Sequence, residues 1–377
     1  MSSGAKRSAD DPPPAATDDA PATKPKKPKG KATGGPVARD ATPRAPAPAA
    51  GAQVLKILSV NVAGLRAVFN DDAKVATLKG LIEGERPDVL AINEHKLQES
   101  HVEEMRPRMA ELLPGFAQHW TCSGAEAGTK KGYSGVALFV REAEAAGAPP
   151  PPRVVAVSTG MGAANAADPI AAHEGRLLTA ELESVVLVAA YVPNSGQDLG
   201  RLAYRTDPAT GWDAKLAAYC AALERERGKG VLLLGDLNVA HDVRDMWQLH
   251  ARPDFAAELA AKPRAEQYTG NKALLKQAGC TAEERDSFSA TLLAPDAGGL
   301  VDTFRARHPD ATGVFTYWSM RANSRPVNKG LRLDYVLASR QLVDDDAPAP
   351  RVVDSFILDS EYPPLADHAP IGCHVLL

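Results

Sequence analysis

Short apolar runs alternate with longer amphipathic stretches from Val54 to the end of the chain. The short runs are rich in Val, Ile and Leu, which is typical of β-strands. Several are apolar at every position, as expected for strands that are buried on both faces. The longer stretches place apolar residues three or four positions apart, which predicts α-helices. We therefore expect an α/β protein in which helices cover β-sheets.

The predicted strands are Val54–Val62, Asp88–Asn93, Gly135–Val140, Arg153–Ser158, Leu177–Leu182, Val185–Val192, Gly230–Leu237, Phe315–Ser319, Arg332–Leu337, Val352–Ile357 and Ile371–Leu376. The predicted helices are Ala73–Glu85, His101–Leu113, Trp212–Gly228 and Thr281–Leu292. The Pro-rich and Asp-rich stretches Ala145–Pro152 and Asp344–Pro350 are expected to be loops.

The first 52 residues differ from the rest of the chain. They contain no Leu, Ile, Phe, Trp or Tyr, and they hold ten of the 30 prolines. Such a segment cannot bury enough apolar surface to offset the entropy lost on ordering. We therefore predict a disordered, basic, Pro/Ala/Lys-rich tail over residues 1–52, followed by one folded domain over residues 53–377.

The charge of the chain is also uneven. Residues 1–52 carry nine Lys or Arg and five Asp or Glu, a net charge of +4. Since the whole chain has a net charge of −4, residues 53–377 carry −8. The basic run Lys24–Lys31 indicates a nuclear import signal or an arm that attracts nucleic acid, although a solubilising tail is an alternative. We expect a nuclear protein. A plastid or mitochondrial location is the weaker alternative, because acidic residues such as Asp10 and Asp18 fall where transit peptides avoid them.

Other classes of protein are disfavoured by composition. No apolar run has the roughly 18 residues that a membrane helix needs. The four cysteines are scattered without a CxxC pair, which indicates reduced thiols rather than a disulfide framework or a zinc site.

Polar side chains appear where the apolar runs stop. The run Val231–Leu234 leads directly into Asp236, Asn238, His241 and Asp242. Asp236 and Asn238 point to the same side of an extended chain. The other run ends carry Asn61; Asn93, Glu94 and Lys96; Tyr191 and Asn194; Asp334; and Asp367 with His368. One such residue is usually a turn or cap, but the whole set favours one rim at which strand ends meet a ligand.

The residue types at these run ends suggest a chemistry. The set holds carboxylates, carboxamides, one imidazole and one phenol, and the sequence has neither a Gly-rich phosphate loop nor a GxSxG motif. Oxygen ligands suit Mg²⁺ or Mn²⁺. A His paired with a carboxylate can move a proton or bind a phosphoryl oxygen. Metal-assisted hydrolysis of a phosphate ester is therefore the expected reaction class.

From about Leu55 to Leu377 the chain resembles the exonuclease III type of apurinic/apyrimidinic endonuclease, within the endonuclease/exonuclease/phosphatase superfamily. The motifs that carry the resemblance follow one another in the family's order. They are Asn61–Arg66, Asp88–Lys96, Lys131–Phe139, His173–Glu181, Tyr191–Gly196, Gly235–Asp242, Ala278–Phe288, Asp302–Trp318, Asn328–Ser339 and Leu365–Ile371. The resemblance implies a DNase I-like, four-layer sandwich of two mixed β-sheets flanked by helices, with the site at one rim.

The resemblance also implies residue roles. The expected metal ligands and their neighbours are Glu94, Asn61, Asp367, Asp236 and Asn238, for Mg²⁺ or Mn²⁺. The expected catalytic residues are Asp236, Asn238, His368, Asp334, Tyr191 and Asn194. The expected DNA-binding residues are Arg66, Lys96, Tyr133, Gln277, Tyr317, Leu331, Leu333 and Arg321, of which Tyr317, Leu331 and Leu333 would hold a flipped-out abasic sugar. Trp318 is expected to pack in the core.

The implied function is a Mg²⁺-dependent endonuclease that acts as a monomer on double-stranded DNA, cuts 5′ of an abasic site and leaves a 3′-hydroxyl. Exonuclease or 3′-phosphodiesterase side activity is expected with it. Ala63, His95 and Leu331 depart from the family's pattern. The alternatives are a broader DNase or phosphatase of the same superfamily, and a DNA-binding regulator without catalysis.

Overall fold

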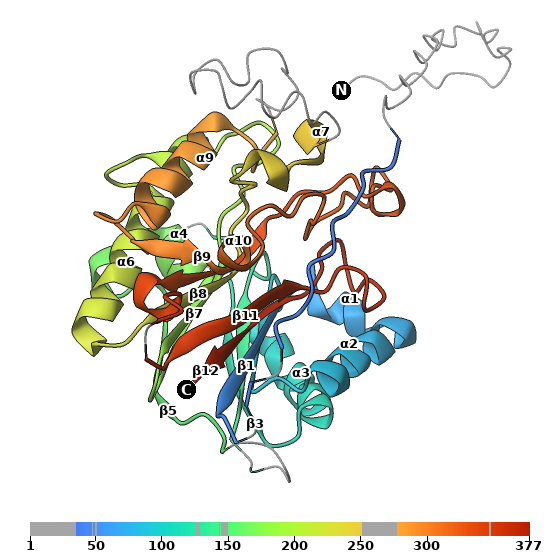
Figure 1. Cartoon of the computed structure of the whole chain (residues 1–377), viewed down its shortest axis with the longest axis vertical. Helices are drawn as coiled ribbons and strands as arrows, with labels where there is room; N and C mark the ends of the chain where they lie inside the picture. The colour runs from blue at the N-terminus through green and yellow to red at the C-terminus, as the bar shows by residue number, and fades with distance from the viewer. Residues whose placement is uncertain are drawn as a thin grey trace, which may run out of the picture. The chain divides into compact units, whose positions relative to one another are not determined.

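The computed structural model describes residues 35–377, apart from residues 47, 50, 125–128, 143, 145–149, 251–276 and 347. The described part belongs to one compact unit that begins at Gly35 (Figure 1). Residues 1–34 of the predicted tail, with the basic run Lys24–Lys31, lie outside the described residues. In the part of the chain that is described, no helix is long and apolar enough to cross a membrane.

Two six-stranded sheets make up the centre of this unit. The first has the order β11-β12-β1-β2-β4-β3 and the second the order β5-β6-β7-β8-β10-β9. Each is mixed, because β1 and β2 run parallel in the first, and β7 and β8 in the second, among antiparallel pairs. The strands are β1 Val54–Asn61, β2 Val89–Asn93, β3 Phe116–Thr121, β4 Val136–Arg141, β5 Val154–Thr159, β6 Leu177–Leu182, β7 Val186–Tyr191, β8 Val231–Asp236, β9 Leu300–Asp302, β10 Asp334–Ser339, β11 Arg351–Ile357 and β12 Ile371–Leu376.

The helices cover the outer faces of the two sheets. They are α1 Leu65–Phe69, α2 Asp72–Glu85, α3 Glu99–Leu112, α4 Pro169–His173, α5 Leu202–Thr206, α6 Trp212–Arg227, α7 Trp247–His250, α9 Ala282–Phe288 and α10 Thr303–Arg307, with short 3₁₀ turns between some of them. Leu78 and Met109 of α2 and α3 pack on the first sheet, whereas Trp212 and Phe288 of α6 and α9 pack on the second (Figure 1). A third core cluster fills the space between the sheets. The predicted four-layer sandwich is therefore confirmed.

Most predicted strands and helices are present, with some differences. The predicted strand Phe315–Ser319 is wrong, because Tyr317 makes only isolated bridges, to Leu331 and His368, before the chain turns. Two strands were not predicted: β9, which is very short, and β3, whose residues are all half-buried and do not alternate in polarity. The helix predicted to reach Leu292 changes at Ser289 into a π-helical turn. Trp318 lies in the core, as predicted.

An N-terminal strap, residues 35–46, crosses the domain before β1 begins (Figure 1). Val37 is buried in the core between the sheets, and its backbone N–H donates to Val327 O at 3.0 Å. Arg39 forms two hydrogen bonds, of 2.6 and 2.5 Å, with the Asp359 carboxylate. The domain therefore extends N-terminally beyond the boundary predicted at residue 53.

The C-terminal part of the strap places a cation beside buried groups. The Arg44 guanidinium lies 3.3 Å from the centre of the Phe356 ring and donates to the Asp354 carboxylate at 2.7 Å. The Asp354 side chain is only 3% exposed, so the strap neutralises a buried charge. Burial of one valine and compensation of a buried carboxylate are each worth a few kcal/mol.

We predict that a chain lacking residues 1–46 has a free energy of unfolding about 2–4 kcal/mol lower than the full chain, because Val37 and the cations over Asp354 and Asp359 are lost. Urea denaturation followed by circular dichroism measures this. The matched control lacks residues 1–34 only, keeps every strap contact, and should unfold at the midpoint of the full chain. Equal stability of the two shortened chains would show that the strap contacts contribute nothing.

Candidate active site

Strand ends from both sheets meet at one rim of the sandwich. Asn61 ends β1 of the first sheet, and Asp236 ends β8 of the second. The Asn61 side-chain amide donates to Glu94 Oε2 at 3.0 Å and to Asp236 Oδ2 at 2.9 Å. One amide thus links two carboxylates that come from different sheets. Glu94 itself has a positive φ of 56°, a backbone conformation that is uncommon for residues other than glycine.

A pair of carboxamides lies next to Asp236. Asn194 Nδ2 donates to Asn238 Oδ1 at 2.9 Å, and Asn238 Nδ2 donates to the carbonyl of Val192 at 2.8 Å. The backbone N–H of Asn238 donates to Asp236 Oδ1 at 2.9 Å. Asn238 also has a positive φ, of 51°, which asparagine tolerates better than most residues. The turn after β8 therefore holds Asp236 and both amides in one arrangement.

The Asp334 carboxylate and the His368 imidazole form the other half of the rim. Asp334 lies opposite Asp236 in the antiparallel pairing of β10 and β8, so two carboxylates face each other. His368 contacts both: its Nδ1 lies 2.7 Å from Asp334 Oδ2, and its Nε2 lies 3.9 Å from Asp236 Oδ2. Like charges placed opposite each other are destabilising, and a protonated imidazole between them offsets the repulsion.

The pKa values of these groups are shifted by their surroundings. Burial would lower the pKa of His368, but the Asp334 and Asp236 carboxylates outweigh it and raise the pKa to about 10. Burial, together with the charge of Asp334, raises the pKa of Asp236 to about 7. Burial raises the pKa of Tyr191 well above its usual value, and the Glu94 carboxylate adds to the effect. His368 and Tyr191 are therefore proton donors at neutral pH, whereas Asp236 can accept a proton.

An open pocket of about 630 Å³ lies beside these groups. Its lining brings together most of the predicted site residues: Glu94, Tyr133, Tyr191, Asn194, Asp236, Asn238, Gln277, Tyr317, Leu331, Leu333, Asp367 and His368, with Gln197 and Ala278. Asn61 and Asp334 contact lining residues through the hydrogen bonds described above. Tyr317, Leu331 and Leu333 belong to one apolar cluster, so the lining combines an apolar surface with the carboxylates.

Three predicted DNA-binding residues do not line this pocket. Lys96 pairs with Glu94, with 2.9 Å between Nζ and Oε1, and is half-exposed. Arg66 on α1 and Arg321 in the turn after Met320 are exposed. These three cations lie outside the lining, where they remain available to a large ligand, and their DNA-binding roles stay a prediction.

Three polar residues near the rim have structural roles. His241 contacts Ser289 Oγ at 2.7 Å and packs on the Phe288 ring, whereas Asp242 caps a short 3₁₀ turn. In the polar run after β8, Asn238 therefore lines the pocket, whereas His241 and Asp242 stabilise the structure around it. His95, which departs from the family's pattern, is fully buried; its Nδ1 accepts from the Leu97 N–H and its Nε2 lies 3.0 Å from the carbonyl of Thr121. Burial lowers its pKa to about 4, so it is neutral and structural.

Sequence reasoning missed several residues that support the site. Arg176 is buried below Tyr191, with its guanidinium 4.9 Å from the ring centre and 2.6 Å from Glu174. Thr316 Oγ1 accepts from the backbone N–H groups of Leu333 and Asp334. No pattern in the sequence distinguishes a buried arginine or threonine of this kind from an exposed one.

The sequence matches the endonuclease/exonuclease/phosphatase family over residues 58–368. The chain belongs to this family. It is 32% identical over 290 residues to an exodeoxyribonuclease of Bacillus subtilis, in an alignment that covers 76% of this chain and 89% of the bacterial protein. It is 33% identical over 317 residues to recombination repair protein 1 of Drosophila melanogaster, which covers 84% of this chain but only 36% of the longer fly protein.

A solved structure, the AP endonuclease of Leishmania major, has the same fold, with a TM-score of 0.65, 27% identity and coverage of 86% of this chain and 88% of that one. The resemblance inferred from the sequence is confirmed by these relatives. Family membership also confirms the prediction that the chain is an enzyme of the nuclease and phosphatase type.

The rim fits a divalent metal ion of the kind predicted for this family. Asp367 Oδ1 is buried and has no hydrogen-bond partner among the described residues, although it belongs to a residue that lines the pocket. Together with Glu94 and Asp236 it provides oxygen ligands of the type preferred by Mg²⁺ and Mn²⁺. Asp236, Asp334 and His368 also place one ligand atom each within 4.8 Å of one another. We favour the carboxylates near Glu94, because His368 Nδ1 and Asp334 Oδ2 are already paired with each other at 2.7 Å.

We predict that Asp334→Asn lowers the pKa of His368 from about 10 by about 1–3 pH units, because the carboxylate that raises it is removed. Titration of the metal-free protein followed by ¹⁵N NMR of the imidazole measures this. The control, Asp354→Asn beside His374, should leave the pKa of His368 unchanged. An unchanged imidazole titration in Asp334→Asn would show that the pair does not set the protonation of His368.

The same pair predicts a pH dependence of stability. The pKa of His368 is raised above its ordinary value of 6.5. Its contribution to the free energy of unfolding is therefore fully present below about pH 6.5 and is lost as the pH rises towards 10.

Proposed function

We propose that this chain is a Mg²⁺-dependent endonuclease of DNA repair that hydrolyses the phosphodiester bond 5′ of an abasic site in double-stranded DNA. One observation carries the proposal: a rim of carboxylates with a protonated imidazole adjoins a pocket wall made of Tyr317, Leu331 and Leu333. The relatives named as an exodeoxyribonuclease and an AP endonuclease support it.

In the proposed reaction a water molecule attacks the phosphorus atom, and the bond from phosphorus to the 3′-oxygen breaks. Asp236 accepts the proton of the water. The 3′-oxygen leaves and takes a proton from solvent, which gives a 3′-hydroxyl. A 5′-phosphate remains on the abasic sugar.

The other rim residues hold the phosphate. His368 Nε2–H donates to a non-bridging oxygen, and Asp334 keeps the imidazole protonated and oriented through Nδ1. The Tyr191 hydroxyl and the Asn194–Asn238 amide pair supply further donors. Glu94, Asp367 and Asp236, with Asn61 beside them, hold Mg²⁺ or Mn²⁺. When bound, the metal ion neutralises negative charge on the leaving oxygen.

The pocket wall supplies the selectivity. A sugar without a base is small, and Tyr317, Leu331 and Leu333 offer an apolar surface to its ring carbons once it is rotated out of the duplex. Arg66, Lys96 and Arg321, outside the lining, contact the phosphates of the flanking duplex in this proposal. As part of the proposal the enzyme acts as a monomer. It acts in the nucleus, a location that the basic run Lys24–Lys31 supports.

We predict a single Mg²⁺-dependent cut 5′ of a tetrahydrofuran abasic-site analogue in a labelled duplex. EDTA should abolish the cut, and Asp236→Asn should lower its rate about 10²–10⁴-fold, because the proton acceptor is lost. The matched control, Asp310→Asn, changes an exposed carboxylate outside the pocket and should cut at the wild-type rate. Ladders that start from the 3′ ends would make exonuclease the main activity. Absence of any cleavage by the folded protein would contradict the proposal.

A further inference from the structure

A buried ionic group contacts the chain on either side of the Asn194–Asn238 amide pair. This group consists of Arg205 on α5, Asp213 on α6 and Glu284 on α9, whose side chains are 1%, 1% and 0% exposed. The Arg205 guanidinium lies 3.4 Å from Asp213 and 3.6 Å from Glu284. None of the three lines the pocket, so none can touch a substrate there.

Arg205 contacts the backbone of the turn that carries the site. Its Nη1 donates to the carbonyl of Asn238 at 2.5 Å, and its Nη2 donates to the carbonyl of Leu237. Both carbonyls belong to residues just beyond β8, where the strand pairing has ended. A planar guanidinium offers two donors in a fixed geometry, so it can hold both carbonyls, and with them the left-handed conformation of Asn238.

Glu284 anchors the other half of the amide pair. Its Oε1 accepts from Ser195 Oγ at 2.5 Å, directly after Asn194 in the chain. Its Oε2 accepts from the backbone N–H of Gly279 at 2.7 Å. The Gly279 carbonyl in turn accepts from the N–H of Ala240, two residues beyond Asn238. The ionic group therefore holds the backbone of Asn238 directly, and it holds Asn194 through the hydroxyl of the next residue, Ser195.

We propose that Arg205 is a positioning residue for the reaction, which acts through the carbonyls of Leu237 and Asn238 and is braced by Glu284. The inference rests on the role in phosphate binding proposed above for Asn238. A lysine at position 205 keeps the positive charge between Asp213 and Glu284 but has no planar fork, so it cannot hold both carbonyls in the same geometry. Small displacements of positioned groups lower the rate of reaction without preventing binding.

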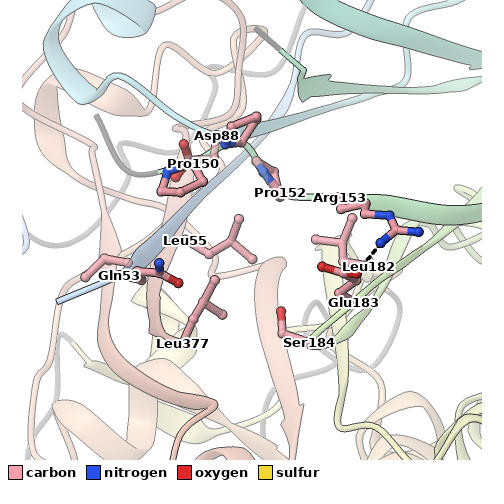
Figure 2. Close-up of a pocket in the computed structure, with 12 residues that line it drawn as sticks. Gln53, Leu55, Asp88, Pro150, Pro152, Arg153, Leu182, Glu183, Ser184 and Leu377 are labelled. Atoms are coloured by element: carbon pink, nitrogen blue, oxygen red, sulfur yellow. Dashed lines mark hydrogen bonds and ion pairs between the residues drawn. The ribbon is translucent and has the colours of Figure 1, made fainter. Parts of the chain in front are cut away.

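A second buried arginine offers a matched control. Arg141, at the end of β4, pairs with Asp88 at 2.6 Å, and both side chains are 8% exposed. Asp88 directly precedes β2, at the opposite end of that strand from Asn93 and the rim. It lines a separate small pocket with Gln53, Pro150 and Leu377 (Figure 2). Arg141→Lys therefore perturbs a buried ion pair of the same kind, far along the sheet from the site.

The experiment compares Arg205→Lys and Arg141→Lys, each in the wild-type chain and in Asn238→Ala, with the tetrahydrofuran duplex and Mg²⁺. We expect Arg205→Lys to lower kcat about 10–100-fold with KM within about twofold, and Arg141→Lys to change kcat less than about twofold. In the Asn238→Ala chain, Arg205→Lys should cause no further loss of kcat, because the side-chain amide that Arg205 positions is already absent.

Two outcomes would overturn the inference: equal kcat in Arg205→Lys and Arg141→Lys, or a full additional loss from Arg205→Lys in the Asn238→Ala chain. A wild-type kcat in Asn238→Ala would instead contradict the proposed function. Circular dichroism checks that each variant is folded. If Arg205→Lys does not fold, Glu284→Gln carries the test, because it removes the charge that braces Arg205 and keeps the length of the side chain. A lower kcat at constant KM is then expected, and an unchanged kcat overturns the inference.

Discussion

The side-chain amide of Asn61 joins the two sheets at the rim where the site lies. Its two N–H groups donate to Glu94, which follows β2 of the first sheet, and to Asp236, which ends β8 of the second. Two carboxylates in a buried rim repel each other unless donors lie between them. The amide supplies both donors without adding a charge, so the carboxylates remain able to bind a cation. The link therefore holds Glu94 beside Asp236.

Buried cations then fix the loops that surround the rim. Arg332 lies between the pocket residues Leu331 and Leu333, and donates to Asp245 at 2.8 and 2.9 Å and to Asp302 at 2.6 Å. Arg205 and Arg176 make comparable buried pairs under the turn after β8 and under Tyr191. Buried ion pairs contribute little net stability, but the loss of one partner leaves an uncompensated charge. Their effect here is to restrict loops that would otherwise have many conformations.

The sequence predicted the parts of the structure that depend on regular patterns. Apolar runs located most strands, and polar residues at the run ends located Asn61 and Asp236, which lie at the carboxyl ends of β1 and β8. Asp334 begins the antiparallel strand β10 and reaches the same rim from the opposite direction. The sequence did not reveal that Asp242 caps a turn and that His241 packs on Phe288, because cap, core and site residues can be of the same types.

Other features depend on contacts that are distant in the sequence. The strap could not be predicted, because its composition is that of a disordered tail and its order comes from Val37, Arg39 and Arg44 meeting residues more than 200 positions away. The buried arginines escaped prediction for the same reason, since an arginine is usually exposed and only its partners reveal that it is buried.

We propose that the carboxylates around Asn61 hold the metal ion, while Asp334 and His368 form a separate protonated pair. Crystals grown with Mn²⁺ and measured for anomalous scattering test this most directly. We predict an anomalous peak at coordination distance from Glu94, beside Asp236 and Asp367, with His368 Nδ1 still hydrogen-bonded to Asp334. A peak shared by Asp334 and His368, with none at Glu94, would contradict it.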